Sequence, residues 1–341
     1  MSTMEKLEVL VIGGGSFGTA LATILANNKR RVAMWVRRQE QADEINQQHS
    51  NERYLPEHKL PESLSAITDL PLGVRSTPII LMSVPSKAFR QVARQIGDHL
   101  TGEQIIVHTT KGIEVDSFKR MSQVLKEETC ALKIGVLSGP NLARELMAGH
   151  PAGALVASRY AQVTHAAQEL FTGSRLRVYT GQDVVGTEFG GAFKNIIALA
   201  AGVANGLGFG DNTKALLITR GLSEMARFGV AVGADVFTFG GLAGIGDLMA
   251  TCASPLSRNH QVGSRLAKGE SLDDIIQSMN QVSEGVPTTK AVWLRAQTLG
   301  LNLPIVKAVY GMLYENVSPK AAVAQLMELG LSSELAALRY Q

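Results

Sequence analysis

The chain has 341 residues, of which 45% are hydrophobic and 18% charged, and its formal net charge is +3. This length allows two domains, because single cores usually stop growing at about 250–300 residues. The composition excludes a disordered chain, and no Lys- or Arg-rich block indicates nucleic-acid or membrane binding. Two cysteines form neither a metal-ligand spacing nor a disulfide framework, and no apolar run approaches the roughly 20 residues of a membrane span. We therefore expect a cytoplasmic protein without a metal centre.

The first half alternates short apolar runs with amphipathic segments. The predicted strands are 7–12, 31–36, 79–84, 104–110, 133–138, 153–158 and 176–180. The predicted helices are 16–28, 39–47, 87–96, 116–126, 141–148 and 161–170, and the Pro-rich stretch 49–78 is expected to hold surface loops and short elements. Several strands are apolar without alternation, which is typical of strands buried on both faces of a parallel sheet. The order predicts an α/β Rossmann-like domain with a mostly parallel, doubly wound sheet.

The second half has no convincing strand. Its predicted helices are 213–228, 273–278, 290–299, 304–314 and 319–329. We expect an α/β domain over residues 1–185 and an all-α domain over 186–341.

A glycine-rich turn follows the first predicted strand. Gly13, Gly15 and Gly18 have the spacing G-x-G-x-x-G and open a helix, which is the context that gives this motif its meaning. Gly13 permits the tight turn, Gly15 lets the backbone approach a pyrophosphate, and Gly18 allows close helix–strand packing. The alternative is a glycine turn without a ligand.

Two arginines end the second predicted strand, where an NAD-preferring site would carry an acidic residue. The guanidinium groups of Arg37 and Arg38 suit a 2′-phosphate, which predicts that NADPH is preferred or at least accepted. The alternative is that one or both are solvated charges at a helix start. Lys111, just after the fourth predicted strand, belongs at the ligand-binding edge of the sheet, although a surface lysine there is equally consistent with its position.

The segment "GGAFKNIIALAAG" carries one charge, Lys194, among small and apolar residues. No acidic residue lies at helical spacing from it. Taken alone, the pattern favours a lysine whose stem lies on apolar surface while its ammonium reaches water.

Motifs along most of the chain fit one family. They are GGGSFGTALA, TTKGIE, SGPNLARE, GGAFKNIIALAAG, LITRGLSEMARFG, GLAGIGDLMATC and SRNHQVG. Over roughly residues 7–315 the sequence resembles the bacterial-type NAD(P)-dependent glycerol-3-phosphate dehydrogenases. The resemblance implies a C-terminal domain of the 6-phosphogluconate dehydrogenase type. It also implies reversible hydride transfer between NAD(P)H and dihydroxyacetone phosphate, giving sn-glycerol 3-phosphate for phospholipid synthesis.

The resemblance also implies roles for individual residues. Lys194 corresponds to the catalytic proton donor and acceptor. The family's cofactor contacts correspond to Ser16, Phe17, Arg37, Lys111, Ala143, Arg258, Val282 and Glu284. Its substrate contacts correspond to Lys111, Gly139, Lys194, Asp247, Ser257, Arg258 and Asn259, to which we add Asn195 of the K-N motif and Asn141. Asn141 departs from the family, which usually has serine or threonine there. The expected partners are NADPH, with NADH as the second option, and a phosphorylated triose; a homodimer is left open.

The chemistry of ketone reduction agrees with these roles. A lysine can donate the proton if burial and neighbouring cations lower its pKa, and Lys111 and Arg258 are the expected cations. Asp247 favours the charged ammonium and is expected to hold Lys194 or a substrate hydroxyl in place. The small residues around Lys194 then suggest space cleared for cofactor and substrate.

Alternatives remain at each level. From sequence alone Asp247 could be a helix N-cap, and S-R-N (257–259) could be a cap followed by a surface arginine instead of an anion clamp. The chain could also be a related two-domain dehydrogenase for another hydroxy or sugar acid, or a non-enzymatic NAD(P) sensor.

Overall fold

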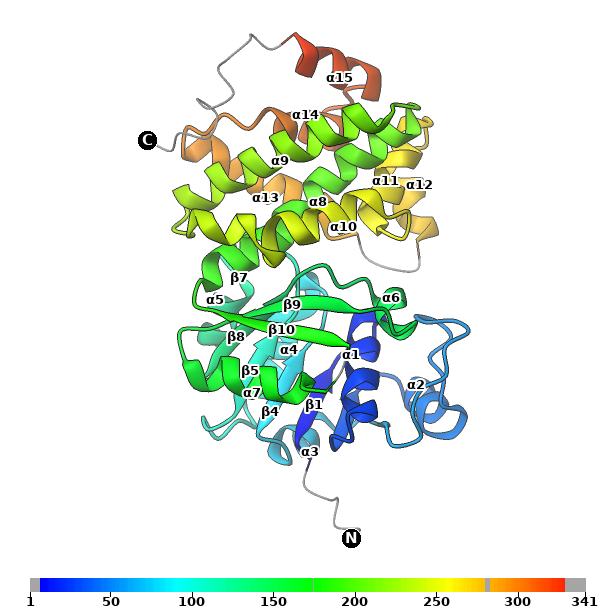
Figure 1. The fold of residues 1–341 in the computed structure, drawn as a ribbon, viewed down its shortest axis with the longest axis vertical. Helices are drawn as coiled ribbons and strands as arrows, with labels where there is room; N and C mark the ends of the chain where they lie inside the picture. Colours follow the sequence, from blue (N-terminus) through cyan, green and yellow to red (C-terminus); the bar gives the residue numbers. More distant parts are fainter. Residues whose placement is uncertain (1–6, 174, 280–282, 329–341) are drawn as a thin grey trace. The chain divides into compact units, whose positions relative to one another are not determined.

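The computed structural model describes residues 7–173, 175–279 and 283–328, and the chain divides into two compact units (Figure 1). Unit 1 consists of the residues up to Thr110 together with Met121–Val184. Unit 2 consists of Lys111–Arg120 together with the residues from Val185 onward. The segment 111–120 therefore packs with unit 2, although the sequence analysis places it within the first domain.

Unit 1 is built on an eight-stranded sheet with the order β10-β9-β8-β5-β4-β1-β2-β3. The strands are β1 Val9–Ile12, β2 Val32–Trp35, β3 Ser65–Ile67, β4 Ile79–Met82, β5 Ile105–His108, β8 Ile134–Ser138, β9 Ala152–Ala157 and β10 Leu176–Gly181. All neighbours are parallel except β8 and β9. The chain reverses its direction of growth beside β1, where open α/β sheets bind ligands.

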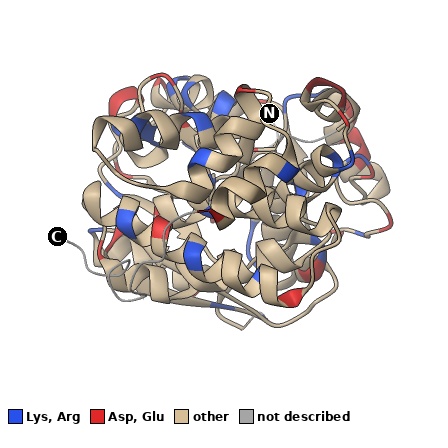
Figure 2. Ribbon diagram, turned by 90° about the horizontal axis from the view of Figure 1, so that it is seen from above, with Lys and Arg blue, Asp and Glu red and all other residues tan. Residues whose placement is uncertain are grey.

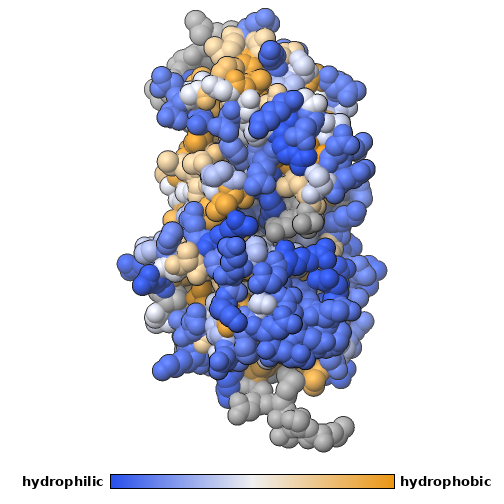
Figure 3. Space-filling model, turned by 90° about the vertical axis from the view of Figure 1, so that its right-hand side faces the viewer, coloured by the Kyte–Doolittle hydropathy of each residue, from blue (hydrophilic) through white to orange (hydrophobic). Residues whose placement is uncertain are grey.

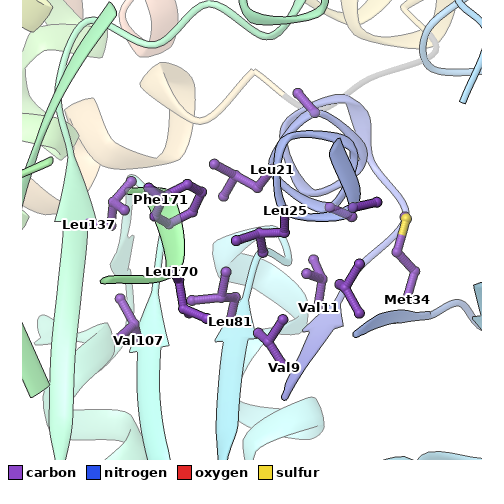
Figure 4. Packing of buried hydrophobic residues seen from close by; sticks show 14 of the residues in the cluster. Val9, Val11, Leu21, Leu25, Met34, Leu81, Val107, Leu137, Leu170 and Phe171 are labelled. Carbon is purple, nitrogen blue, oxygen red and sulfur yellow. The ribbon is translucent and has the colours of Figure 1, made fainter. Parts of the chain in front are cut away.

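Helices cover both faces of this sheet. The bounds are α1 Ser16–Asn27, α2 Gln39–Asp43, α3 Leu70–Arg75, α4 Ser86–Gly97, α5 Met121–Glu128, α6 Ala143–Met147 and α7 Ala161–Phe171, with a π-helical turn, η1, over Glu44–Gln48. Successive β1 side chains enter opposite cores: Val9 and Val11 pack with α1 and α7, and Leu10 and Ile12 pack with α4 and α5. Figure 4 shows the first core, in which Leu21 and Leu25 of α1 lie over the strands.

The structure corrects the sequence reading at short elements. A helix was expected over 116–126, but α5 starts at Met121, and 119–120 form strand β7. Phe118 just before that strand has φ 55°, a left-handed conformation that no helix continues through. The stretch 49–78 holds short elements, as expected, namely β3 and α3.

Unit 2 is helical apart from a small hairpin. The helices are α8 Val184–Gly206, α9 Asp211–Ala231, α10 Asp247–Ala253, α11 Arg258–Ala267, α12 Leu272–Ser278, α13 Gly285–Thr298, α14 Pro304–Tyr314 and α15 Pro319–Met327; short turns η2 Val236–Gly240 and η3 Leu242–Gly246 precede α10. The hairpin pairs β6 (Ile113–Glu114) with β7 (Lys119–Arg120). Helix α8 is buried along most of its length, so the other elements pack around it.

The fold confirms the predicted Rossmann-like domain followed by a helical domain. Among the described residues, none of the helices has the length and apolarity needed to cross a membrane. Basic and acidic positions are scattered over the ribbon in Figure 2. On the face drawn in Figure 3, hydrophilic residues predominate and the hydrophobic ones form small separate patches. Such patches are ordinary for a protein surface.

Glu224 anchors one helix of unit 2 to another. It is buried on α9 and accepts the backbone N–H groups of Ile305, at 2.7 Å, and Val306, at 3.1 Å. These groups belong to the first turn of α14, whose N–H groups have no partner within the helix. Burial raises the pKa of Glu224 to about 7, while the two N–H donors oppose that shift.

We predict that Glu224→Ala lowers the free energy of unfolding by about 1–3 kcal/mol, because two buried N–H groups lose their acceptor. Thermal and urea unfolding of both proteins measures this. Glu224→Gln is the matched control, since its amide oxygen still accepts one N–H. An unfolding free energy within error of the wild type in Glu224→Ala would show that α14 does not depend on this contact.

Candidate functional site

The glycine turn of unit 1 has the geometry that its three roles require. Gly13 has φ +115°, and a Cβ there would collide with the Ser83 carbonyl. A Cβ on Gly18 would collide with the carbonyl of Gly13. A Cβ on Gly15 would meet no atom within 4 Å. Gly13 and Gly18 are therefore glycines for packing within the protein, whereas Gly15 faces open space.

Side chains from elsewhere in the chain fix the turn. Gln41 and Asn51 donate to the Gly14 carbonyl at 2.8 and 3.0 Å, and Asn51 also donates to Oγ1 of Thr19. Ser16 donates to the carbonyl of Tyr54 at 2.8 Å. The sequence analysis missed Gln41 and Asn51, because no spacing rule connects them to the glycines.

The turn fits the pyrophosphate of a dinucleotide. Helix α1 starts at Ser16 with Gly15 as its N-cap, and no side chain caps it. An uncapped helix start presents N–H groups and the positive end of the helix dipole to an anion. Phe17, in the same turn, is half-buried against the core that α1 covers. Open space at Gly15 lets a phosphate approach this backbone.

The other predicted cofactor residues of unit 1 lie at strand ends. Arg37 and Arg38 follow β2 and are exposed, and Arg38 is the N-cap residue of α2. Ala143 is the first residue of α6 and is half-buried. Both arginines lie next to the strand that pairs with β1, the strand that leads into the glycine turn.

Gly139 and Asn141 follow β8. Gly139 has φ +141°, which favours glycine. Asn141 donates from Nδ2 to the Gly153 carbonyl at 2.9 Å. Its Oδ1 is buried, and among the described residues it finds no hydrogen-bond donor. Because a carbonyl can only accept, the amide orientation is fixed, and Asn141 presents an acceptor to whatever approaches it.

The centre of unit 2 is a buried carboxylate between two lysines. Lys194, in α8, is 6% exposed and donates to Oδ1 of Asp247 and, at 2.8 Å, to Oγ1 of Thr251. Oδ2 of Asp247 accepts from Nζ of Lys111 at 2.7 Å. Asp247 is the first residue of α10, not its cap. Thr251, one turn further along α10, was not predicted, because its role depends on a contact between distant parts of the chain.

This arrangement perturbs Lys194. Burial lowers the pKa of Lys194 well below its ordinary value, the carboxylate of Asp247 opposes the shift, and the nearby Lys111 ammonium adds to it. Among the described residues, two of the three N–H bonds of the ammonium find acceptors, which leaves the third for a ligand. Burial raises the pKa of the neighbouring Cys252 thiol to about 12, so this cysteine stays neutral near pH 7.

The expectation that the glycines near Lys194 clear space for ligands is wrong at two positions. A Cβ on Gly190 would collide with the carbonyl of Ala243, and one on Gly202 would collide with the carbonyl of His260. These glycines let neighbouring backbone pack directly against α8. The alternative that Lys194 snorkels to water is excluded, since its ammonium is buried against Asp247.

A chain of amides extends from the lysines. Asn195 donates to the Lys111 carbonyl at 3.2 Å, and its Oδ1 accepts from Asn259 at 2.8 Å. Oδ1 of Asn259 accepts from the Ser283 hydroxyl at 2.6 Å and from the Gly285 N–H at 2.9 Å. These contacts bring together two predicted substrate residues and the start of α13.

The remaining predicted residues lie around this chain. Ser257 is the N-cap of α11 and accepts the His260 N–H at 3.3 Å, and Arg258, the first residue of α11, is exposed. Glu284 is half-buried just before α13. Val282 lies outside the described residues.

A Rossmann-like unit with an anion-binding turn, and a helical unit with a buried lysine of lowered pKa, define a nucleotide-dependent oxidoreductase. Family models agree. One described as NAD-dependent glycerol-3-phosphate dehydrogenase N-terminus matches residues 8–164, and one described as its C-terminus matches residues 183–324. The chain belongs to the NAD(P)-dependent glycerol-3-phosphate dehydrogenase family.

Individual relatives support the same conclusion. Glycerol-3-phosphate dehydrogenase (NAD(P)+) of Halothermothrix orenii is 48% identical over 96% of this chain and 96% of its own length. The Acinetobacter baylyi protein of the same name is 46% identical over 96% of this chain and 92% of its own. The crystal structure of glycerol-3-phosphate dehydrogenase from Coxiella burnetii is 36% identical, with a TM-score of 0.91 over 95% of this chain and 99% of that one. The predicted family, oxidoreductase class and NAD(P) dependence are confirmed, which sets aside the sensor and the other hydroxy-acid dehydrogenases.

Alanine substitutions at Gly15 and Gly18 should have different effects, because a Cβ has room at Gly15 and collides with backbone at Gly18. Gly15→Ala should change the free energy of unfolding by about 1 kcal/mol or less, because its Cβ has room and its φ of −77° suits alanine. It should weaken NADPH binding, because the Cβ occupies the space a phosphate needs. Gly18→Ala should instead destabilise the protein by about 1–3 kcal/mol, since its Cβ overlaps a backbone carbonyl. Thermal unfolding and NADPH fluorescence titration separate the two effects; equal losses of stability in both variants would refute this assignment.

Proposed function

We propose that Lys194 is the proton donor in the NAD(P)H-dependent reduction of dihydroxyacetone phosphate to sn-glycerol 3-phosphate, and the acceptor in the reverse direction. The observation that carries the proposal is the buried Lys194 ammonium, which donates to Asp247 and Thr251 and has a third N–H bond to offer. A general acid works best when its pKa is near the working pH, and the lowered pKa of Lys194 meets that condition.

The proton transfer follows from these contacts. Bound NAD(P)H supplies a hydride for the carbonyl carbon of the substrate. Asp247 and Thr251 accept two N–H bonds of the Lys194 ammonium and so fix the direction of the third, which is available to the carbonyl oxygen of the substrate. As the carbonyl oxygen gains negative charge, Lys194 gives it a proton and becomes a neutral amine, which recovers its proton from water. In the reverse direction the neutral amine takes the proton from the alcohol.

Local charge suits a phosphorylated substrate. Two ammoniums around one carboxylate leave one positive charge near Lys194. The substrate phosphate is expected to bind Ser257, Arg258 and Asn259, where a hydroxyl, a guanidinium and an amide follow one another at the start of α11. Phosphate binding remote from the carbonyl also orients the reacting group. Gly139 and Asn141 would contribute a close backbone approach and a hydrogen-bond acceptor.

Further parts of the proposal rest on sequence. The exposed Arg37 and Arg38 favour NADPH over NADH. The reaction would feed glycerophospholipid synthesis in the cytoplasm.

The proton-donor role predicts a loss of activity when Lys194 is replaced. The purified chain should oxidise NADPH when dihydroxyacetone phosphate is added, and Lys194→Ala should lower kcat by about 10²–10⁴-fold, the range that general acids contribute. NADPH binding should stay within about threefold, because the backbone of the glycine turn supplies its main contacts.

Lys194→Arg is the matched control, since it keeps the positive charge but holds its proton at neutral pH. It should be as inactive as Lys194→Ala. In the wild type, kcat for reduction should fall as pH rises through the lowered pKa of Lys194, because the acid form is lost. A folded Lys194→Ala with near-normal kcat excludes the role of proton donor.

The arginines after β2 predict the cofactor preference. Arg37→Asp should raise KM for NADPH by about tenfold or more, since it removes a charge-assisted contact to the 2′-phosphate. KM for NADH should change little, because NADH lacks that phosphate. Arg38→Asp, measured beside it, shows whether the second arginine shares the contact. If the ratio of KM for NADPH to KM for NADH is unchanged in both variants, the proposed contact with the 2′-phosphate is wrong.

A further inference from the structure

Residues 111–120 contain the paired strands β6 and β7, and we call this segment the 111–120 hairpin. It belongs to unit 2, although the residues before and after it belong to unit 1. It follows β5 and precedes α5, both of which belong to unit 1. Its strands β6 and β7 have only two residues each. So short a hairpin is not stable on its own, and side-chain contacts with unit 2 must hold it.

The first end of the hairpin carries Lys111. Its ammonium donates to Asp247 at 2.7 Å, and its carbonyl accepts from Asn195 at 3.2 Å. Both the charge and the backbone of Lys111 are thus tied to the group of residues around Lys194.

The middle of the hairpin joins the core of unit 2. Ile113 is 2% exposed within that core. The ring of Phe118 stacks on Phe189 of α8 with 5.9 Å between centroids, and the Arg295 guanidinium lies 5.6 Å from the centroid of the Phe118 ring. These contacts bury apolar side chains of the hairpin in the core of unit 2 and so stabilise it there.

The far end is fixed by a charge pair. Arg120 forms an ion pair with Glu188, whose side chain is 3% exposed. Glu188 belongs to α8, the helix that also carries Lys194 and Asn195. The two ends of the hairpin are therefore attached to the same helix, at Glu188 and through Asn195.

We propose that Arg120 and Glu188 are positioning residues for the reaction. Their ion pair fixes the 111–120 hairpin on α8, and this keeps the Lys111 ammonium against Asp247 beside Lys194. The inference rests on the proposed function of Lys194 and adds two residues that touch neither substrate nor cofactor.

Replacing a buried ion pair by well-packed apolar residues is often neutral or stabilising, because the charges lose their hydration on burial, so such a pair is weak evidence for stability. The pair does add direction, since a guanidinium binds a carboxylate in a fixed geometry that apolar contacts do not impose. We therefore expect its loss to alter kinetics more than stability.

The test is a double variant, Arg120→Gln with Glu188→Gln, which removes both charges of the pair together. We expect kcat/KM for dihydroxyacetone phosphate to fall about tenfold, less than the roughly hundredfold that a 1 Å misplacement can cost. The pH at which kcat for reduction falls should move upward, as it should in Lys111→Met, because less positive charge then faces Lys194. Among the described residues, the other groups that face Lys194 are Asp247, Thr251 and Cys252, and none of them changes.

Two further variants of the chain serve as controls for this test. Arg265→Gln with Glu270→Gln removes another arginine–glutamate pair of unit 2, one on the surface of α11, and should leave the kinetics and the pH profile unchanged. Arg120→Lys keeps the charge but loses the guanidinium geometry, so it should show the same kinetic changes in smaller degree even if the double variant folds poorly.

Each result decides the question. If Lys194→Ala loses activity while the double variant and Arg120→Lys keep the wild-type kcat/KM and pH profile, the positioning role is wrong and the role of Lys194 stands. If Lys194→Ala keeps its activity, the proposed function itself fails. Lower melting temperatures with an unmoved pH profile in both Arg120 variants would make the pair purely structural and overturn the proposal.

Discussion

The carboxylate of Asp247 is the contact on which unit 2 depends. It is 1% exposed and binds two ammoniums, those of Lys194 and Lys111. Without it, two like charges would lie side by side in a medium that stabilises neither of them. With it, the group keeps one net positive charge, which attracts an anion, while burial lowers the pKa of Lys194. The Asp247 side chain therefore both offsets the repulsion between two buried ammoniums and holds the lysine proposed as proton donor.

Glycines in and around α8 create this contact. Gly190 allows the backbone at Ala243 to touch α8, and four residues further along each segment lie Lys194 and Asp247. A second close approach occurs where Gly202 meets the carbonyl of His260, the residue that follows Asn259. Small residues near the lysine thus do bring reactive groups together, by helix packing and not by leaving room for a ligand.

The sequence predicted what depends on local pattern. Apolar runs gave seven of the strands in the sheet, and strand, turn and helix around Gly13 gave the anion-binding turn. It could not give β3, β6 or β7, because two or three residues carry no readable period. Nor could it connect Gln41 and Asn51 to Gly14, or Thr251 to Lys194, since these contacts exist only in the folded chain. Asp247 entered the prediction only through the family resemblance.

Asn259 shows how geometry narrows a role taken from a family. Its Oδ1 accepts from Ser283 and Gly285, and one hydrogen of its Nδ2 is given to Asn195. A side-chain amide has two such hydrogens, so a single donor is left for a substrate. The same amide ties the carbonyl of Lys111, through Asn195, to the backbone that precedes α13 and carries Glu284. Replacing Asn259 would therefore disturb residues predicted for the cofactor as well as for the substrate, and a loss of substrate affinity alone would not identify it as a substrate contact.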